Sequence, residues 1–138
     1  MASQLINLSD AQLDQLQAEF AERGYVVLRN VIGQADRTGL VEQIRAAIEP
    51  LVGPAEFEAD VGYPGAPVDR LAPGGKTPRR LLHAYARSAE FKALATHPQV
   101  AQVLGRFLAG SVCLSQCHHN CIMTKHPGFS SATLWHQD

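Results

Sequence analysis

The sequence has few cysteines, no excess of basic residues and no long apolar run. Its 138 residues include 12 Lys and Arg and 13 Asp and Glu, for a formal net charge of −1. This balance disfavours a nucleic-acid-binding protein, which usually carries a basic patch. No apolar run reaches the roughly 18 residues needed to span a bilayer. The opening MASQLIN lacks a basic region followed by an apolar stretch, so no secretory signal is predicted and a cytoplasmic protein is expected.

The cysteines are Cys113, Cys117 and Cys121, all in one short stretch. An odd number of cysteines so closely spaced is not typical of a disulfide framework. Cys117 and Cys121, together with His118 and His119, raise the possibility of a zinc site, since tetrahedral zinc uses cysteine and histidine ligands. The paired spacings typical of such sites are absent. A strand with ordinary polar residues is therefore favoured.

The composition is that of a globular protein, with 46% hydrophobic and 18% charged residues. The length suits one domain and is sufficient to bury a core. Four helical segments are predicted. The first follows the N-cap Ser9 and ends at Gly24, and the others cover 34–51, 88–95 and 98–108, the last beginning at a proline.

A strand is predicted at 25–29 (YVVLR), which is β-branched and aromatic, and further strands are predicted at 111–125 and 132–135. The segment 53–78 holds five prolines and five glycines and is predicted to be a flexible loop; such long loops tend to be functional or disordered. Residues 79–85 fit either a short helix or a strand. Helices followed by strands indicate an α+β fold rather than a doubly wound one.

The motif with the clearest chemistry is TLWHQD, which places His136 and Asp138 two residues apart. On a strand, side chains at i and i+2 point to the same face. An imidazole and a carboxylate so placed can bind one metal ion. With a second histidine they make the two-His-one-carboxylate triad of non-haem Fe(II) oxygenases. An isolated H-x-D also occurs in ordinary surface turns.

The sequence around this motif resembles the phytanoyl-CoA dioxygenase family, a branch of the Fe(II)/2-oxoglutarate oxygenases. The similar stretch is CIMTKHPGFSSATLWHQD, residues 121–138, with a strand ending in lysine, a Pro-Gly turn and the metal motif. The segment GYVVLRNVI, residues 24–32, resembles the opening of the same family. The resemblance touches both ends of the chain.

The resemblance implies a double-stranded β-helix, or jelly roll, with Fe(II) and 2-oxoglutarate as cofactors. His136 and Asp138 match two metal ligands of the family, and no further catalytic residue is predicted. The implied reaction is an O2-dependent hydroxylation of a small organic substrate. The charge balance and the lack of a long apolar run predict no nucleic-acid or membrane partner. Neither the substrate nor the oligomeric state follows from the sequence.

Four residues are candidates for the co-substrate pocket, because the matching strand in the family lines it. They are His119, Cys121, Met123 and Lys125, which would share one face of the predicted strand. Lys125 aligns with a family lysine just before the turn. The alternative is that Cys121 and Met123 pack in the core and Lys125 is solvated.

Arg79, Arg80, His83 and Arg87 form a modest basic cluster in the sequence. The cluster could meet an acidic substrate or the co-acid. A solvated surface is the favoured interpretation.

In the family, a distal histidine ligand and an arginine that binds 2-oxoglutarate follow the metal motif. Residues 1–138 extend only to Asp138 of that motif, so they include neither. We therefore expect 1–138 to be a single truncated dioxygenase domain, the N-terminal portion of a larger enzyme, inactive on its own. Residues 1–110 would form its helix-rich part and 111–138 its first core strands. The alternative is a non-catalytic metal-binding or interaction module derived from the same fold.

Overall fold

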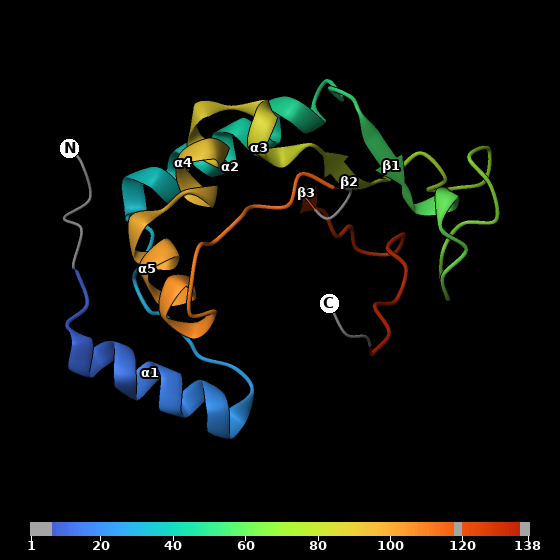
Figure 1. Cartoon of the computed structure of the whole chain (residues 1–138). Helices are drawn as coiled ribbons and strands as arrows, with labels where there is room; N and C mark the ends of the chain where they lie inside the picture. The colour runs from blue at the N-terminus through green and yellow to red at the C-terminus, as the bar shows by residue number, and fades with distance from the viewer. Residues whose placement is uncertain (1–6, 118–119, 136–138) are drawn as a thin grey trace.

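The chain folds into an arch of helices and short strands, shown by a computed structural model that describes residues 7–117 and 120–135 (Figure 1). The mixture of helices with a small antiparallel sheet agrees with the predicted α+β class, and the jelly roll stays a prediction. The elements in chain order are α1 (Asp10–Arg23), α2 (Gln34–Ile48), β1 (Ala55–Phe57), the 3-10 helix η1 (Glu58–Asp60), β2 (Pro78–Leu82), α3 (Ala84–Arg87), α4 (Ala89–Ala95), α5 (Pro98–Phe107) and β3 (Cys121–Met123).

Local capping chemistry sets the ends of α1 where the sequence predicts them. The Ser9 hydroxyl accepts a 3.4 Å hydrogen bond from the Gln12 backbone N–H, and the Gln12 side chain accepts a 2.9 Å bond from the Ser9 N–H. This reciprocal pair is a capping box. Gly24 ends the helix with a φ of 79°, a left-handed conformation that glycine adopts without steric cost.

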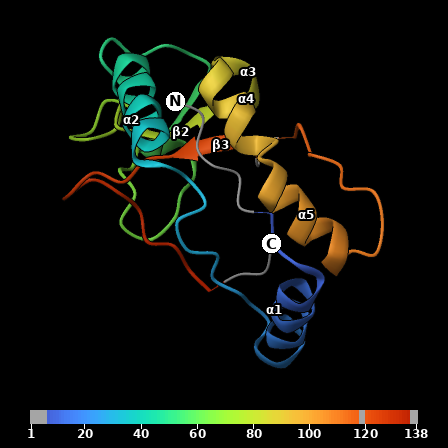
Figure 2. The same cartoon turned by 90° about the vertical axis from the view of Figure 1, so that its left-hand side faces the viewer.

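Helix α1 packs against α5, and together they form one end of the arch. The rings of Phe20 and Phe107 stack with centroids 4.9 Å apart, while Leu13 and Val103 are buried. The Gln102 side chain bonds both backbone groups of Leu8, donating to the carbonyl at 3.0 Å and accepting from the N–H at 3.3 Å. Figure 2 shows α5 lying between α1 and the α3–α4 pair.

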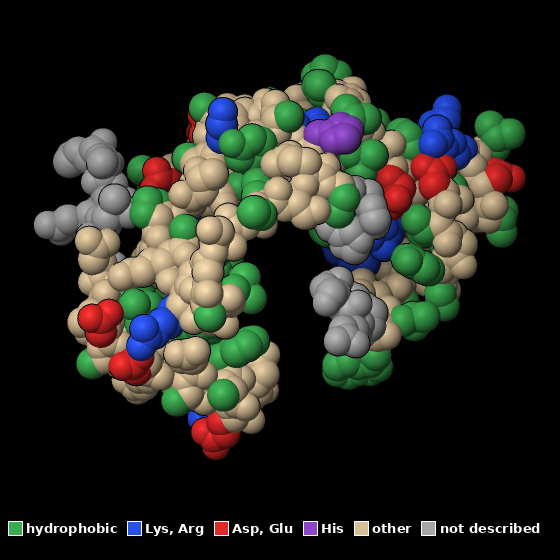
Figure 3. Space-filling model, in the orientation of Figure 1, with side chains coloured by type: hydrophobic (Ala, Val, Ile, Leu, Met, Phe, Trp, Pro, Cys, Tyr) green, Lys and Arg blue, Asp and Glu red, His purple; other side chains and the backbone are tan. Residues whose placement is uncertain are grey.

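The other end of the arch contains the sheet, whose strand order is β1-β2-β3 with both pairs antiparallel. Leu81 in the central strand is paired with Ala55 on one side and Ile122 on the other, and it is fully buried. The choice left open for residues 79–85 therefore has a mixed outcome: 79–82 belong to strand β2, and 84–85 begin the short helix α3. Figure 3 shows the inner side of the arch hollowed between the α1–α5 end and the sheet end.

The strand predicted at 25–29 is wrong, since these residues form irregular structure. Tyr25 and Val27 are each 58% exposed. A β-branched and aromatic sequence favours extended structure, but a strand needs a neighbour to accept its hydrogen bonds. Among the described residues no strand pairs with this segment.

The predictions for the C-terminal strands are also largely wrong. Of the long strand expected at 111–125, only Cys121–Met123 pairs in the sheet, and 111–117 is exposed. No strand forms at 132–135. Conversely, the expected loop 53–78 contains β1 and η1 and provides the first residue of β2.

The helix predicted at 34–51 ends earlier, at Ile48. The apolar side chains along one face of this helix are only partly covered: Leu40, Ile44 and Ile48 are half-buried, and Val41 is 44% exposed. No helix in the described part of the chain is both long and apolar enough to cross a membrane.

Candidate functional site

The predicted metal ligands His136 and Asp138 lie outside the described residues, as does His119, so these three assignments stay predictions. Within 7–117 and 120–135, no group of three or more His, Cys, Asp or Glu side chains could hold a metal ion. Cys113 and Cys117 are exposed and Cys121 is half-buried. The structure therefore describes the segment that leads to the metal motif, up to Trp135.

That segment is fixed to the sheet and to the loop before it by hydrogen bonds. The Thr124 N–H donates to the Arg79 carbonyl at 2.9 Å, and the Thr124 hydroxyl donates to the Pro78 carbonyl. Further along, the Ala132 N–H donates to the Pro64 carbonyl at 2.9 Å. These contacts hold both ends of the 126–131 turn before the chain reaches Trp135, which is fully exposed.

Glu58 is the most buried polar residue beneath this segment, with 0% of its surface exposed. Its Oε2 accepts a 3.0 Å hydrogen bond from the Ser131 backbone N–H. The Lys125 ammonium donates to the Ser131 carbonyl at 2.8 Å. Ser131 is therefore bound through both of its backbone groups, and Glu58 and Lys125 together determine where the chain leaves the turn.

The electrostatics of this cluster favour an ionised Glu58. Burial alone would raise the pKa of its carboxyl group. The Ser131 backbone N–H, the nearby hydroxyls of Ser131 and Ser130 and the positive charge of Lys125 outweigh burial, and the pKa lies below its usual value of 4.5. The cluster thus holds a buried carboxylate rather than a neutral acid.

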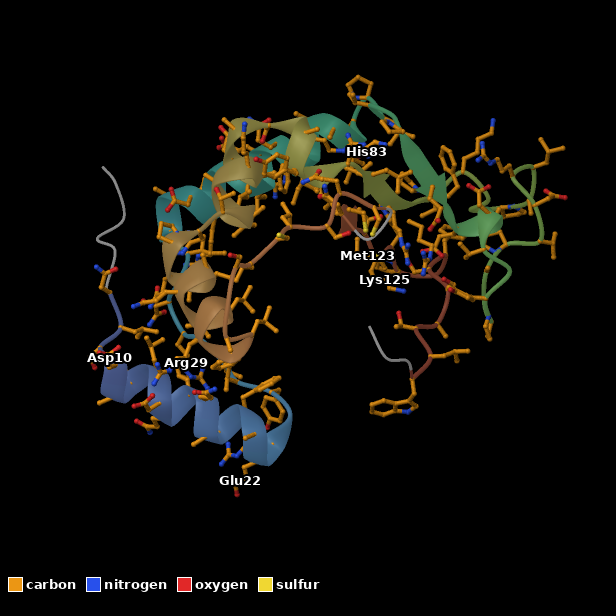
Figure 4. The ribbon with its side chains drawn as sticks, viewed as in Figure 1. Asp10, Glu22, Arg29, His83, Met123 and Lys125 are labelled. Carbon is orange, nitrogen blue, oxygen red and sulfur yellow. The ribbon has the colours of Figure 1, made fainter. Side chains whose placement is uncertain are left out.

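The candidate pocket residues that are described lie on or just after β3. Met123 pairs with Arg80 and is 46% exposed, and Cys121 pairs with Leu82. Figure 4 places Met123 and Lys125 on the inner side of the arch. Burial raises the pKa of the Cys121 thiol, which keeps it protonated. A role for these side chains in binding 2-oxoglutarate stays a prediction.

The predicted basic cluster does not form one solvated surface. Arg79 is only 4% exposed, and its Nη1 is 2.6 Å from Oε1 of Glu56. Arg80 Nε lies 3.5 Å from the same oxygen. His83 lies on the outer side of the arch, away from Met123 and Lys125 (Figure 4). The solvated interpretation is therefore wrong for Arg79.

The sequence analysis does not single out Glu56 and Glu58, two of the carboxylates at the sheet end. Both lie in the segment 53–78, where the many prolines and glycines predicted only a loop. Their partners are distant in the chain, at Arg79 and Ser131. No local pattern marks such pairs; the one available signal was three alternating carboxylates, Glu56, Glu58 and Asp60, in a Pro- and Gly-rich stretch.

Comparison with known families gives one result that covers most of the chain. A protein-family model described as phytanoyl-CoA dioxygenase (PhyH) matches residues 20–138. Searches of curated proteins and of solved structures give no match. The matched range includes the sheet, the turn at 126–131 that is anchored at both ends, and the W-H-Q-D motif.

Proposed function

Because the chain belongs to the phytanoyl-CoA dioxygenase family, we propose that it contributes to an Fe(II)- and 2-oxoglutarate-dependent oxygenase that hydroxylates a small organic molecule. His136 and Asp138 are the proposed metal ligands. The observation that carries this proposal is the family match, which extends through both residues.

The chemistry of the donor pair supports iron. A neutral imidazole and a carboxylate separated by one residue provide two of the three protein ligands in the facial triad of non-haem Fe(II) oxygenases. In the family the third ligand is a histidine further along the sequence. Bound iron with 2-oxoglutarate would supply the oxidising power, and the residues of this chain would hold and orient the metal.

The anchored turn supports a positioning role for the residues before the motif. Lys125 and Glu58 fix Ser131 from two directions, and Pro64 fixes Ala132. Only 133–135 separate these anchors from His136. A ligand delivered by a chain that is bound so near to it loses less conformational freedom when the metal binds.

The proposal is tested by titrating the protein with Fe(II) under anaerobic conditions, following binding by calorimetry. His136→Ala and Asp138→Ala should each weaken binding by at least about tenfold, which corresponds to about 1.4 kcal/mol. The matched control is His126→Ala, since this imidazole lies in the same segment but outside the motif.

The control should bind Fe(II) as the unaltered protein does. Equal affinity in the unaltered protein and in both motif variants would overturn the assignment. Oxygenase chemistry is examined separately, in a protein that also contains the distal histidine and the arginine of the family, by measuring CO2 released from 2-oxoglutarate with Fe(II) and O2. Release that disappears in His136→Ala and persists in His126→Ala is the expected result.

A further inference from the structure

Arg87, in the short helix α3, binds three backbone carbonyls. Its Nε donates to Leu82 at 2.7 Å, its Nη1 to Val52 at 3.0 Å and its Nη2 to Pro54 at 2.6 Å. These bonds join the end of β2 to the segment between α2 and β1. They also hold the guanidinium in one orientation.

The positive charge of Arg87 is not matched by a carboxylate. No Asp or Glu in the described part of the chain forms an ion pair with it. Burial lowers the pKa of the guanidinium, because a partly buried charge is less well hydrated than an exposed one. A guanidinium carries five N–H donors; three bond the carbonyls, which leaves one donor on each terminal nitrogen.

Arg87 lines a cleft of about 470 Å³ between α2, α4 and the segment before β1. Its volume lies within the range of about 300–1,000 Å³ that is usual for small-molecule sites. Most of its surface is apolar, and the apolar side chains include Ala46, Ala47, Val52, Leu82 and Phe91. No lining residue is acidic.

The second group at the cleft able to carry a positive charge is His83, an exposed side chain on the outer side of the arch (Figure 4). Its φ of 59° is a left-handed conformation, unusual for a residue with a side chain. The cleft thus combines an apolar wall with an oriented cation and an imidazole. Met123 and Lys125 lie on the other, inner side of the arch.

We propose that this cleft is a binding site for a small organic monoanion with an apolar body, such as an aliphatic carboxylate. The carboxylate accepts the N–H groups that remain on the two terminal nitrogens of Arg87, since a guanidinium suits carboxylates through its several donors. The apolar body lies against the alanine, valine, leucine and phenylalanine side chains. This site is separate from the W-H-Q-D motif and does not depend on iron.

The test uses hexanoate as the probe and hexan-1-ol, which has the same carbon chain without the charge, as its control. The ¹⁵N-labelled protein is titrated with each probe, and amide chemical shifts are followed by NMR. Hexanoate should shift the resonances of Ala47, Gly53 and Ala86, which line the cleft, in a saturable manner. Hexan-1-ol should bind at least about tenfold more weakly, since it cannot pair with the guanidinium.

Two variants locate the site. Arg87→Gln removes the charge, and hexanoate affinity should fall by at least about tenfold to the level of the alcohol. Because that change also breaks the carbonyl contacts, Ala47→Leu provides an independent test: it fills the cleft, leaves Arg87 in place and should weaken binding equally. Ala35→Leu, at an exposed position of the same helix outside the cleft, should bind as the unaltered protein does.

Three results would each overturn the proposal. The first is equal affinity for hexanoate and hexan-1-ol, which would show an apolar cleft without anion selectivity. The second is unchanged hexanoate binding in folded Ala47→Leu. The third is the absence of saturable shifts up to about 20 mM hexanoate, since the affinity expected of a small ligand lies in the millimolar range or tighter; Arg87 would then have only a structural role.

Discussion

The Ser131 backbone N–H donates a 3.0 Å hydrogen bond to Oε2 of Glu58, although 73 positions separate the two residues. The bond joins the 3-10 helix η1 to the segment that leads to the W-H-Q-D motif. Both residues are buried, Glu58 completely and Ser131 to 3% exposed. Because an unpaired buried donor is costly, this bond contributes more than an average surface hydrogen bond.

Glu58→Ala should therefore lower the free energy of unfolding by about 1–3 kcal/mol, because it leaves the Ser131 N–H buried without an acceptor. The measurement is urea denaturation at pH 7, and the control is Glu42→Ala on the exposed surface of α2. The control should change the unfolding free energy by less than about 0.5 kcal/mol. Equal effects of the two substitutions would show that the Glu58 bond adds nothing to stability.

The lowered pKa of Glu58 predicts a pH dependence with a definite sign. Its usual value is 4.5, and its folded value lies below that. As pH falls, the unfolded chain therefore takes up this proton first, and stability is lost through and below pH 4.5. The contribution is fully present at neutral pH.

The experiment compares the unfolding free energy of the unaltered protein with that of Glu58→Gln from pH 7 down to acid. The lowered pKa values of Asp60 and Glu90 act in the same direction in both proteins, so the difference between the proteins isolates Glu58. This difference should shrink as the pH falls below 4.5. A difference that stays constant with pH would contradict a carboxylate stabilised by Ser131 and Lys125.

Two ion pairs with different burial should respond differently to the loss of their arginines. The Arg79 side chain is 5% exposed in its pair with Glu56, whereas the Arg23 side chain is 56% exposed in its pair with Glu19. Arg79→Met should cost up to about 3 kcal/mol, because it removes the closer of the two arginine partners of the partly buried Glu56 carboxylate and leaves only Arg80 at 3.5 Å. Arg23→Met should cost less than about 1 kcal/mol. Thermal or urea unfolding measures both, and similar losses would contradict the burial of Arg79.

The helices were predictable because their signals are local. Ser9 and Gly24 limit α1, and Pro98 begins α5, as the sequence indicates. Ser88 caps α4 by accepting a 3.4 Å hydrogen bond from the Phe91 N–H. Each signal acts within a few residues, so no knowledge of the tertiary structure is needed to read it.

The strands were predicted less well because pairing is not local. YVVLR at 25–29 has the residues of a strand but no partner in the described sheet, while Ala55–Phe57 lies in a Pro- and Gly-rich stretch and pairs with β2. The same holds for the candidate site. A two-residue spacing marks His136 and Asp138 in the sequence, whereas the contact of Glu58 with Ser131 appears only in the fold.

The loop before β2 offers a last prediction, based on a close backbone approach at Gly75. A Cβ atom added there would lie 2.1 Å from the Asp69 carbonyl oxygen and 2.8 Å from the carbonyl carbon of Arg70. This backbone is held in place, because the Asp69 carboxylate accepts the N–H groups of Leu71 and Ala72 at 2.7 and 2.8 Å. Gly75→Ala should therefore destabilise the protein by about 1–3 kcal/mol, the usual cost of overpacking.

The matched control for Gly75→Ala is the same substitution at Gly39, inside α2. The nearest heavy atom to a Cβ there is Cγ of Glu90, at 3.9 Å, an ordinary contact with a flexible side chain. Gly39→Ala should stabilise the protein by up to about 1 kcal/mol, since alanine has the higher helix propensity. Urea denaturation should thus move the two variants in opposite directions. A stabilised Gly75→Ala would mean that the backbone at Asp69 and Arg70 can move away, and the close approach at this loop would be refuted.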